Sequence, residues 1–252
     1  MVSRATPTAR RSRTDEERIM TAPIVLIANT AGGTGKTTSA HAIAVASVEY
    51  GKSVLVVDAD PSATLTFLAG IENPRTTVAE LLQGSFTIES AVIKSAERFS
   101  LIPSASRAFG HEGEWNWLEE ARTKFDLVII DSPTGPSPAL RDIASYATMT
   151  VIPILDSFLA LRGALHVADF LRSAQSPSKI ALMPIRCDGI KGEYRSMISD
   201  PLTILEPAIR FDNAIVEAET SMRSVLTLAP NSQAASDYRE VTYSILESVG
   251  LF

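Results

Sequence analysis

The 252-residue chain contains one cysteine, Cys187, and this scarcity excludes two kinds of architecture. A single thiol cannot form a disulfide framework within the chain, and it cannot supply the paired cysteines of an iron–sulfur or zinc site. No apolar run is long enough to cross a bilayer as a helix, so no membrane partner is predicted. Basic residues are also in the minority, and the formal net charge of −6 excludes a surface that is basic all over.

Residues 1–22 have few of the apolar side chains that a packed core needs. Five arginines lie here among Ser, Thr and Pro, without the apolar stretch of a secretory signal. We therefore predict a disordered basic segment at 1–22, or translation that starts at Met20. The alternative is a basic arm that contacts nucleic acid phosphates. Residues 23–252 are long enough for one domain, and we predict a single one.

From Pro23 onward, apolar runs of strand length alternate with segments of helical period. The runs without polar interruption are typical of parallel strands buried on both faces, and they are Ile24–Ala28, Val54–Val57, Phe99–Ile102, Leu127–Ile130, Thr150–Ile154 and Ile180–Ile185. Helices are predicted between and after them, at Thr38–Tyr50, Val78–Leu82, Glu114–Thr123, Pro138–Tyr146, Ala160–Ser173, 212–221 and 232–249. This order predicts an α/β fold: a doubly wound, mostly parallel sheet with helices on both faces, which binds ligands at the carboxyl ends of its strands.

The segment after the first predicted strand carries the strongest functional signal. It reads Thr-Ala-Gly-Gly-Thr-Gly-Lys-Thr-Thr and leads directly into a predicted helix. Glycines let backbone N–H groups point at phosphate oxygens, and the helix N-terminus adds partial positive charge. Lys36 is placed to reach the β- and γ-phosphates, and the Thr37 hydroxyl is placed to ligate magnesium. The segment therefore predicts a nucleotide site made by Gly32, Gly33, Thr34, Gly35, Lys36, Thr37 and Thr38.

Three aspartates follow predicted strands and are expected to converge on this loop. Asp58 and Asp60 come after the second strand, and Asp131 comes after the Leu127–Ile130 strand. Phosphoryl transfer needs a metal across the β- and γ-oxygens and a group that positions the nucleophile in line. A cap of the following helix or turn explains Asp58 taken alone, but it does not explain all three.

These motifs jointly resemble the ParA/MinD family of P-loop ATPases, over about Pro23 to Ser248. Asp58-Ala-Asp60-Pro61 resembles the family's second motif, and Asp60 stands 24 residues after Lys36, the family's spacing for the aspartate that orients water. Phe125–Pro133 resembles the Walker B strand, and the later segments Val151–Pro153 and Phe158–Gly163 also match. The resemblance implies ATP and Mg²⁺ as cofactors.

Residue roles also follow from the resemblance. Lys36 and Asp60 would be catalytic, and Arg186 would lie near the adenine. The magnesium site would be formed by Thr37, Asp58 and Asp131.

One position departs from the family pattern. The lysine that begins the family's loop motif, and that reaches the phosphates of the partner subunit, is replaced here by Ala31. Some relatives, including the McdA-type positioning ATPases, lack this lysine too. Arg141 or Arg162, on helices after later strands, is a candidate substitute cation, because a guanidinium matches phosphate geometry. A solvated arginine on a helix face is the simpler interpretation of each.

The resemblance implies a ParA-type ATPase in the cytoplasm that is nucleoid-associated when ATP-bound. Its ATP-bound homodimer would bind duplex DNA without sequence preference and, with a ParB-like or cargo-adaptor protein, position a plasmid, chromosome or protein cargo. Basic residues that could form a DNA-contacting patch are Lys191, Arg195, Arg210, Arg223 and Arg239. The last helix lacks the basic face of a MinD-type membrane anchor. Two alternatives stay open: a P-loop ligase or synthetase that phosphorylates a small carboxylate substrate, and a nucleotide-binding adaptor that has lost turnover.

Overall fold

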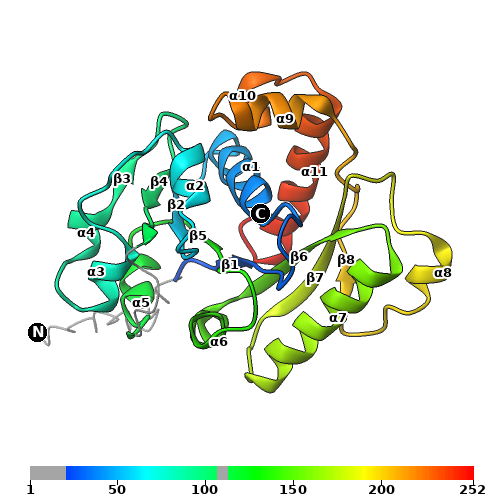
Figure 1. The fold of residues 1–252 in the computed structure, drawn as a ribbon, viewed down its shortest axis with the longest axis horizontal. Coiled ribbons are helices and arrows are strands. Elements are labelled where there is room, and N and C mark those ends of the chain that lie inside the picture. Colours follow the sequence, from blue (N-terminus) through cyan, green and yellow to red (C-terminus); the bar gives the residue numbers. More distant parts are fainter. Residues whose placement is uncertain (1–20, 107–112) are drawn as a thin grey trace, which may run out of the picture.

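The computed structural model describes residues 21–106 and 113–252, and it folds around one eight-stranded sheet (Figure 1). The strands are β1 (Ile24–Ile27), β2 (Val54–Asp58), β3 (Ile93–Lys94), β4 (Ser100–Ile102), β5 (Leu127–Asp131), β6 (Met149–Leu155), β7 (Lys179–Ile185) and β8 (Thr203–Ile204). Their spatial order is β3-β4-β2-β5-β1-β6-β7-β8. The predicted doubly wound α/β fold is confirmed. The basic segment predicted at 1–22 lies almost entirely outside the described residues.

The sheet is parallel except at one edge, where β3 pairs antiparallel with β4. Strand β1 lies between β5 and β6 and pairs parallel with both. The chain thus adds β2 to β5 on one side of β1 and then adds β6 to β8 on the other side. Such a reversal opens a crevice at the carboxyl ends of the central strands.

Helices cover both faces of this sheet (Figure 1). They are α1 (Lys36–Glu49), α2 (Thr64–Leu68), α3 (Val78–Leu82), α4 (Ile88–Ala91), α5 (Trp117–Ala121), α6 (Pro138–Tyr146), α7 (Phe158–Ser173), α8 (Gly192–Arg195), α9 (Asn213–Thr220), α10 (Val225–Leu228) and α11 (Gln233–Ser248). Side chains of α1, α10 and α11 pack on one face, and those of α3, α5, α6 and α7 pack on the other.

Alternation along the central strand explains why both faces are apolar. Val25 and Ile27 of β1 belong to the core under α1 and α11, whereas Ile24 and Leu26 belong to the core under α6 and α7. All four side chains are completely buried. Each successive side chain of a strand points to the opposite face, so an uninterrupted apolar run is needed to fill two cores.

The predicted helices differ from the observed ones mainly at their ends. Helix α5 begins at Trp117, not at Glu114. Gly113, four residues before this helix, packs against the backbone of Leu82 at the end of α3, where a Cβ would have no room. At the end of α1, Gly51 takes a φ of 80° and stops the helix, as the sequence predicts. Within the described ranges, we find no helix whose length and apolar character suffice to span a membrane.

Candidate active site

The loop between β1 and α1 has the conformation that its glycines allow. Gly33 and Gly35 both have φ of 70°, a left-handed value that side chains with a Cβ rarely adopt. At Gly35 a Cβ would also stand only 2.8 Å from Cδ1 of Ile185 on β7. The left-handed turn therefore requires glycine at position 35, whereas the close contact is with the tip of a side chain rather than with the backbone of β7. Gly32 has open space around its Cα, so packing alone does not demand glycine there.

Polar side chains fix the start of this loop to the sheet. The buried Asn29 donates through Nδ2 to the carbonyl of Pro153 on β6, at 2.8 Å, and its Oδ1 accepts from the backbone N–H of Ala31, at 3.0 Å. The hydroxyl of Thr34 donates back to the carbonyl of Ala31, at 3.1 Å. The loop is therefore held before any ligand binds, which lowers the ordering cost of binding an anion.

Lys36 lies at the first position of α1 and is linked to Asp60 through one intermediate hydroxyl. Its Nζ donates to Oγ1 of Thr134, at 3.2 Å, and that hydroxyl donates to Oδ2 of Asp60, at 3.3 Å. Lys36 is only 7% exposed, so its charge is largely shielded from water. The ammonium group of Lys36 is thus connected to the carboxylate of Asp60 through a single hydroxyl group. Thr134 was missed by sequence reasoning, because its place three residues after Asp131 carries no recognisable spacing signal.

Thr37 and Asp131 form the second polar pair of the site. The hydroxyl of Thr37 donates to Oδ2 of Asp131, at 2.7 Å, and this aspartate is completely buried at the end of β5. Among the described residues, no hydrogen bond reaches Oδ1 of Asp131. Burial and the charge of neighbouring Asp58 raise the pKa of Asp131 well above its usual range, although the Thr37 bond and Lys36 oppose this. A buried carboxylate oxygen without a partner is costly and is suited to bind a cation or its water.

Asp58 stands beside Asp131 because β2 and β5 pair in register there. Its Oδ2 accepts from both the N–H and the hydroxyl of Thr66 on α2, at 2.9 and 2.7 Å, and its Oδ1 accepts from the N–H of Asp60, at 3.2 Å. Burial raises the pKa of Asp58 to about 6 against the effect of these bonds. Asp58 therefore anchors α2 and the turn that carries Asp60. The contact with Thr66 has no sequence signal beyond helix periodicity.

The side-chain oxygens at this edge of the sheet fit a magnesium ion that is ligated partly by the protein and partly by phosphate. Within the described residues, no group of three or more His, Cys, Asp or Glu side chains forms a ready metal site. Magnesium in nucleotide sites is typically held by one or two carboxylates together with phosphate oxygens and water. The unpartnered oxygen of Asp131 and the hydroxyl of Thr37 supply that kind of partial ligand set.

A small cavity lies on the other side of the loop, toward β7. It measures about 20 Å³ and is lined by Gly35, Thr38, Ile185, Arg186, Ile209, Ile215, Glu219 and Tyr238. Arg186 has a φ of 56°, an uncommon backbone conformation for a residue with a side chain. The predicted nucleotide residues Thr38 and Arg186 are thus brought together here. Glu219 was not predicted, because it lies 181 residues after Thr38.

The candidate substitute cations lie in different surroundings. The guanidinium of Arg141, on α6, lies over the ring of Phe170 on α7, with its carbon 5.6 Å from the ring centroid. Arg162 is an exposed residue of α7. Neither arginine has a hydrogen bond or ion pair to the loop within the described part of the chain, so the role predicted for them at Ala31 stays a prediction.

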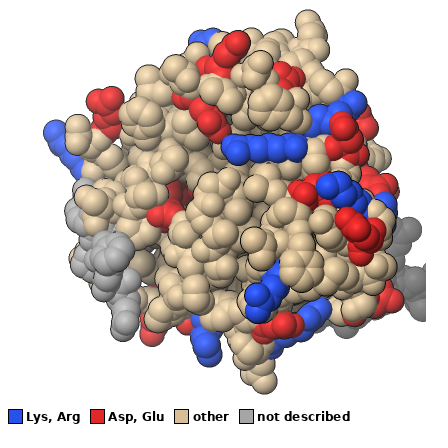
Figure 2. Space-filling view, turned by 45° about the vertical axis from the view of Figure 1, so that its right-hand side comes forward, with Lys and Arg blue, Asp and Glu red and all other residues tan. Residues whose placement is uncertain are grey.

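Four of the five basic residues proposed as a DNA-contacting patch are paired with carboxylates. Figure 2 shows blue and red side chains interspersed on one face of the molecule. The ion pairs are Lys191–Asp156, Arg195–Glu206, Arg210–Asp237 and Arg239–Glu49. The fifth, Arg223, lines a cavity of about 10 Å³ together with Glu219 and His41.

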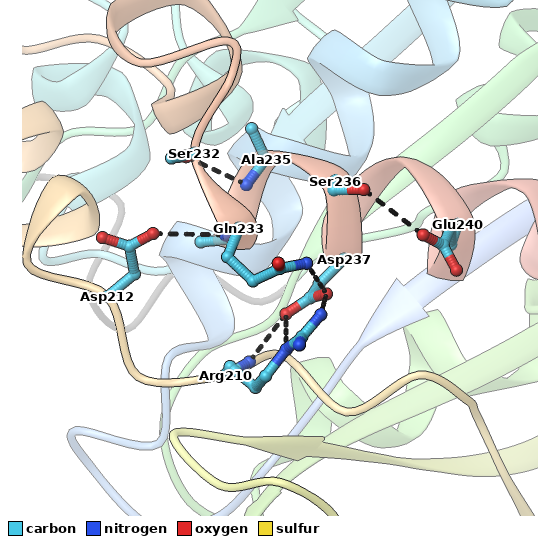
Figure 3. Close-up of polar contacts among 9 residues, drawn as sticks. Arg210, Asp212, Ser232, Gln233, Ala235, Ser236, Asp237 and Glu240 are labelled. Carbon is cyan, nitrogen blue, oxygen red and sulfur yellow. Dashed lines mark hydrogen bonds and ion pairs between the residues drawn. The ribbon is translucent and has the colours of Figure 1, made fainter.

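Arg210 and Asp237 form the tightest of these pairs (Figure 3). Asp237 of α11 is completely buried and accepts from the backbone N–H, Nε and Nη2 of Arg210, at 3.0, 3.0 and 2.5 Å. Gln233 donates to it as well, at 3.1 Å. Burial by itself would raise the pKa of Asp237, but Arg210 lowers it overall. Arg210 thus holds the chain before α9 onto α11.

Comparison with known proteins finds relatives that match most of this chain. The chromosome-partitioning ATPase Soj of Thermus thermophilus is 26% identical over 245 residues, which cover 89% of this chain and 96% of the relative. The septum site-determining protein MinD of Synechocystis is 29% identical over 184 residues, which cover 70% of this chain and 69% of the relative. The crystal structure of cobyrinic acid a,c-diamide synthase from Mycobacterium smegmatis, with an ATP analog and magnesium, is 26% identical and has a TM-score of 0.76. That match covers 90% of this chain and 94% of the other.

The family model AAA_31, described as an AAA domain, matches residues 22–183. This range contains the loop, its following helix and all three strand-end aspartates. Because the match extends over more than half of the sequence, the chain belongs to the AAA_31 family of AAA domains, and its relatives include Soj and MinD.

Proposed function

We propose that this chain is a magnesium-dependent ATPase of the ParA/MinD type, whose nucleotide state controls dimerisation and the positioning of a cargo. One observation carries the proposal. The polar chain Lys36–Thr134–Asp60 and the pair Thr37–Asp131 meet at the loop where the backbone is shaped to bind an anion. The positioning role is supported by the relatives Soj, a chromosome-partitioning ATPase, and MinD, a septum site-determining protein.

Each residue has a distinct part in the proposed hydrolysis. The loop N–H groups and Lys36 neutralise the β- and γ-phosphates of ATP. Thr37 and Asp131, with Asp58 behind them, would hold Mg²⁺, which would supply positive charge at the β- and γ-oxygens. Asp60 accepts a hydrogen bond from the attacking water and orients it in line with the γ-phosphate. Thr134 keeps Asp60 and Lys36 in register until ATP arrives.

Dimerisation is proposed without the lysine that other family members place at Ala31. The ATP-bound homodimer would then rest on contacts to the phosphates and on the turn after Asp60. A ParB-like or cargo-adaptor partner would stimulate turnover, and association with the nucleoid would follow from DNA binding. The ion pairs of the basic residues favour weak DNA binding, since a phosphate must displace a carboxylate to reach them.

Light scattering after size-exclusion chromatography tests this proposal on the Asp60→Ala protein, with ATP and magnesium and with ADP as control. We expect a dimer with ATP and a monomer with ADP, and retention of a random-sequence duplex only by the dimer at low salt. A protein that stays monomeric with both nucleotides and ignores DNA contradicts the positioning role.

The second candidate is a P-loop ligase or synthetase that activates a small carboxylate. The likeness to the cobyrinic acid a,c-diamide synthase structure favours it. The two functions differ in their need for an acceptor, because a synthetase transfers the γ-phosphoryl group to its substrate. The first candidate is supported if the purified protein hydrolyses ATP without an acceptor, and if a partner protein raises this rate while small carboxylates do not. Hydrolysis that appears only with a carboxylate acceptor supports the second.

A further inference from the structure

Thr38 of the nucleotide loop is hydrogen-bonded to a carboxylate from a distant part of the chain. Its hydroxyl donates to Oε1 of Glu219 on α9, at 2.5 Å. This is the length of a charge-assisted hydrogen bond between a hydroxyl and a carboxylate. The neighbouring residue Ser39 is hydrogen-bonded to the hydroxyl of the buried Tyr238 on α11, at 3.2 Å. The first turn of α1 is thus in polar contact with two C-terminal helices.

Glu219 has capacity for a further hydrogen bond. Within the described residues, only Oε1 has a hydrogen-bond partner, and Glu219 forms no ion pair there, although Arg186 and Arg223 line the two cavities that it borders. An ionised carboxylate accepts up to about four hydrogen bonds, two at each oxygen. Oε2 is therefore open to a donor from a ligand.

The cavity between Thr38, Glu219 and Arg186 has the size of one small polar group. Its volume is about 20 Å³. A water molecule needs about 10–15 Å³ measured in this way, so the cavity admits a hydroxyl group but not a purine base. Its walls combine the side chains of Ile185, Ile209 and Ile215 with this single carboxylate.

We propose that Glu219 recognises a ribose hydroxyl of the bound nucleotide and thereby selects ribonucleotides over deoxyribonucleotides. The inference rests on the proposed ATP site. In that site the phosphates lie on the Gly33–Thr37 loop and the base lies toward Arg186. The sugar joins these two parts, so it passes the cavity beside Thr38. Carboxylates serve the same purpose in dinucleotide sites, where an acidic side chain accepts a hydrogen bond from the ribose 2′-hydroxyl.

Calorimetry with magnesium tests this by comparing ATP, 2′-deoxy-ATP and 3′-deoxy-ATP. Loss of a hydrogen bond to a charged group weakens binding by roughly tenfold or more. We therefore expect the wild-type protein to prefer ATP over one of the deoxy analogues by about that factor. Glu219→Ala should bind all three nucleotides with nearly equal affinity. Glu219→Gln keeps the shape and an acceptor oxygen, so it should retain part of the preference, and the exposed Glu247→Gln should retain all of it.

Other outcomes overturn the inference in distinguishable ways. Equal affinity of the wild-type protein for the three nucleotides shows that no ribose hydroxyl is recognised. A preference that survives in Glu219→Ala assigns the recognition to another residue. A uniform loss for all three nucleotides in Glu219→Ala, together with a lower unfolding temperature, shows that Glu219 only ties α9 to α1. Failure of the wild-type protein to bind ATP refutes the nucleotide site itself, and the inference falls with it.

Discussion

His41 and Glu97 form a buried pair that connects the helix after the nucleotide loop to the turn between β3 and β4, at one edge of the sheet. Nε2 of His41, on α1, is hydrogen-bonded to Glu97, in the turn between β3 and β4. The same carboxylate accepts from the backbone N–H of Ser224, at 3.0 Å, at the start of α10. The side chains of His41 and Glu97 are 3% and 10% exposed. One carboxylate therefore joins three elements.

This pair makes stability depend on pH on the acid side. Burial by itself would raise the pKa of Glu97, but His41, with hydrogen bonds from Thr227 and Ser224, lowers it overall. A lowered folded-state pKa gives stability that is present above the unfolded value and lost as the pH falls through the folded value. Urea unfolding at a series of pH values should show this loss, and Glu97→Gln should flatten it. A variant whose acid dependence equals that of the wild type contradicts the assignment.

Lys36→Ala should abolish tight ATP binding, because the phosphates lose a cation held in a preorganised loop. Hydrogen bonds to charged groups contribute about 1.5–3 kcal/mol, so affinity should fall at least roughly tenfold. Calorimetry with ATP and magnesium measures this. Lys179→Ala, at the opposite end of the sheet, is the matched control and should bind like the wild type. Unchanged affinity in Lys36→Ala would show that this loop does not bind the phosphates of ATP.

Asp60→Ala should bind ATP normally but hydrolyse it about a hundredfold more slowly or worse, because a positioned proton acceptor is lost. Thr134→Val should lower the rate less, since Thr134 only holds Asp60 and Lys36 in place. Single-turnover hydrolysis separates the chemical step from binding. Wild-type rates in Asp60→Ala would move the water-orienting role to another residue.

Asp131→Asn should have opposite effects on the free and the nucleotide-bound protein. The free protein should be as stable as the wild type or more stable, because a buried charge with an unpartnered oxygen is removed. The extra thermal stability that ATP gives in magnesium over EDTA should disappear. Melting temperatures with and without ATP, each in magnesium and in EDTA, check both effects. A variant that keeps the full magnesium effect shows that the ion is held without Asp131.

Thr66→Val should destabilise the protein by about 1–3 kcal/mol, because two buried groups lose a partner. Oδ2 of Asp58 loses the hydroxyl donor, and the N–H of Ser104 loses its acceptor at 2.9 Å. Chemical unfolding measures the difference in the free energy of unfolding. Thr64→Val, at the exposed start of the same helix, is the control and should change stability little. Equal effects of the two substitutions contradict the anchoring role of Thr66.

The sequence was most informative where one physical requirement dominates a segment. All six predicted strands are present, because parallel strands buried on both faces need uninterrupted apolar runs. Helix α6 has the predicted ends, since Ser137 caps it and Pro138 starts it. The short edge strands β3 and β8 were not predicted, because a strand of two residues has no period to detect.

The candidate site was predictable in its loop but not in its supporting contacts. Lys36, Thr37 and Asp131 are recognisable because their spacing is set by one turn and two strand ends. Thr134 and Glu219 contact the same loop through single hydrogen bonds from residues 98 and 181 positions away. Such partners depend on how the helices pack, and local sequence carries no record of that. The same holds for the ion pairs of the basic residues, whose partners lie on other elements.

Those ion pairs mean that the surface carries its own counterions. When a free arginine contacts a DNA phosphate, a condensed cation leaves the DNA, and the gain in its entropy makes binding fall steeply with salt. When Arg195 or Arg239 makes the same contact, Glu206 or Glu49 is left bare and attracts a cation in turn. The net release per contact is then smaller. DNA binding through these ion-paired arginines should therefore be weak even at low salt, and it should decline only gradually as salt is added.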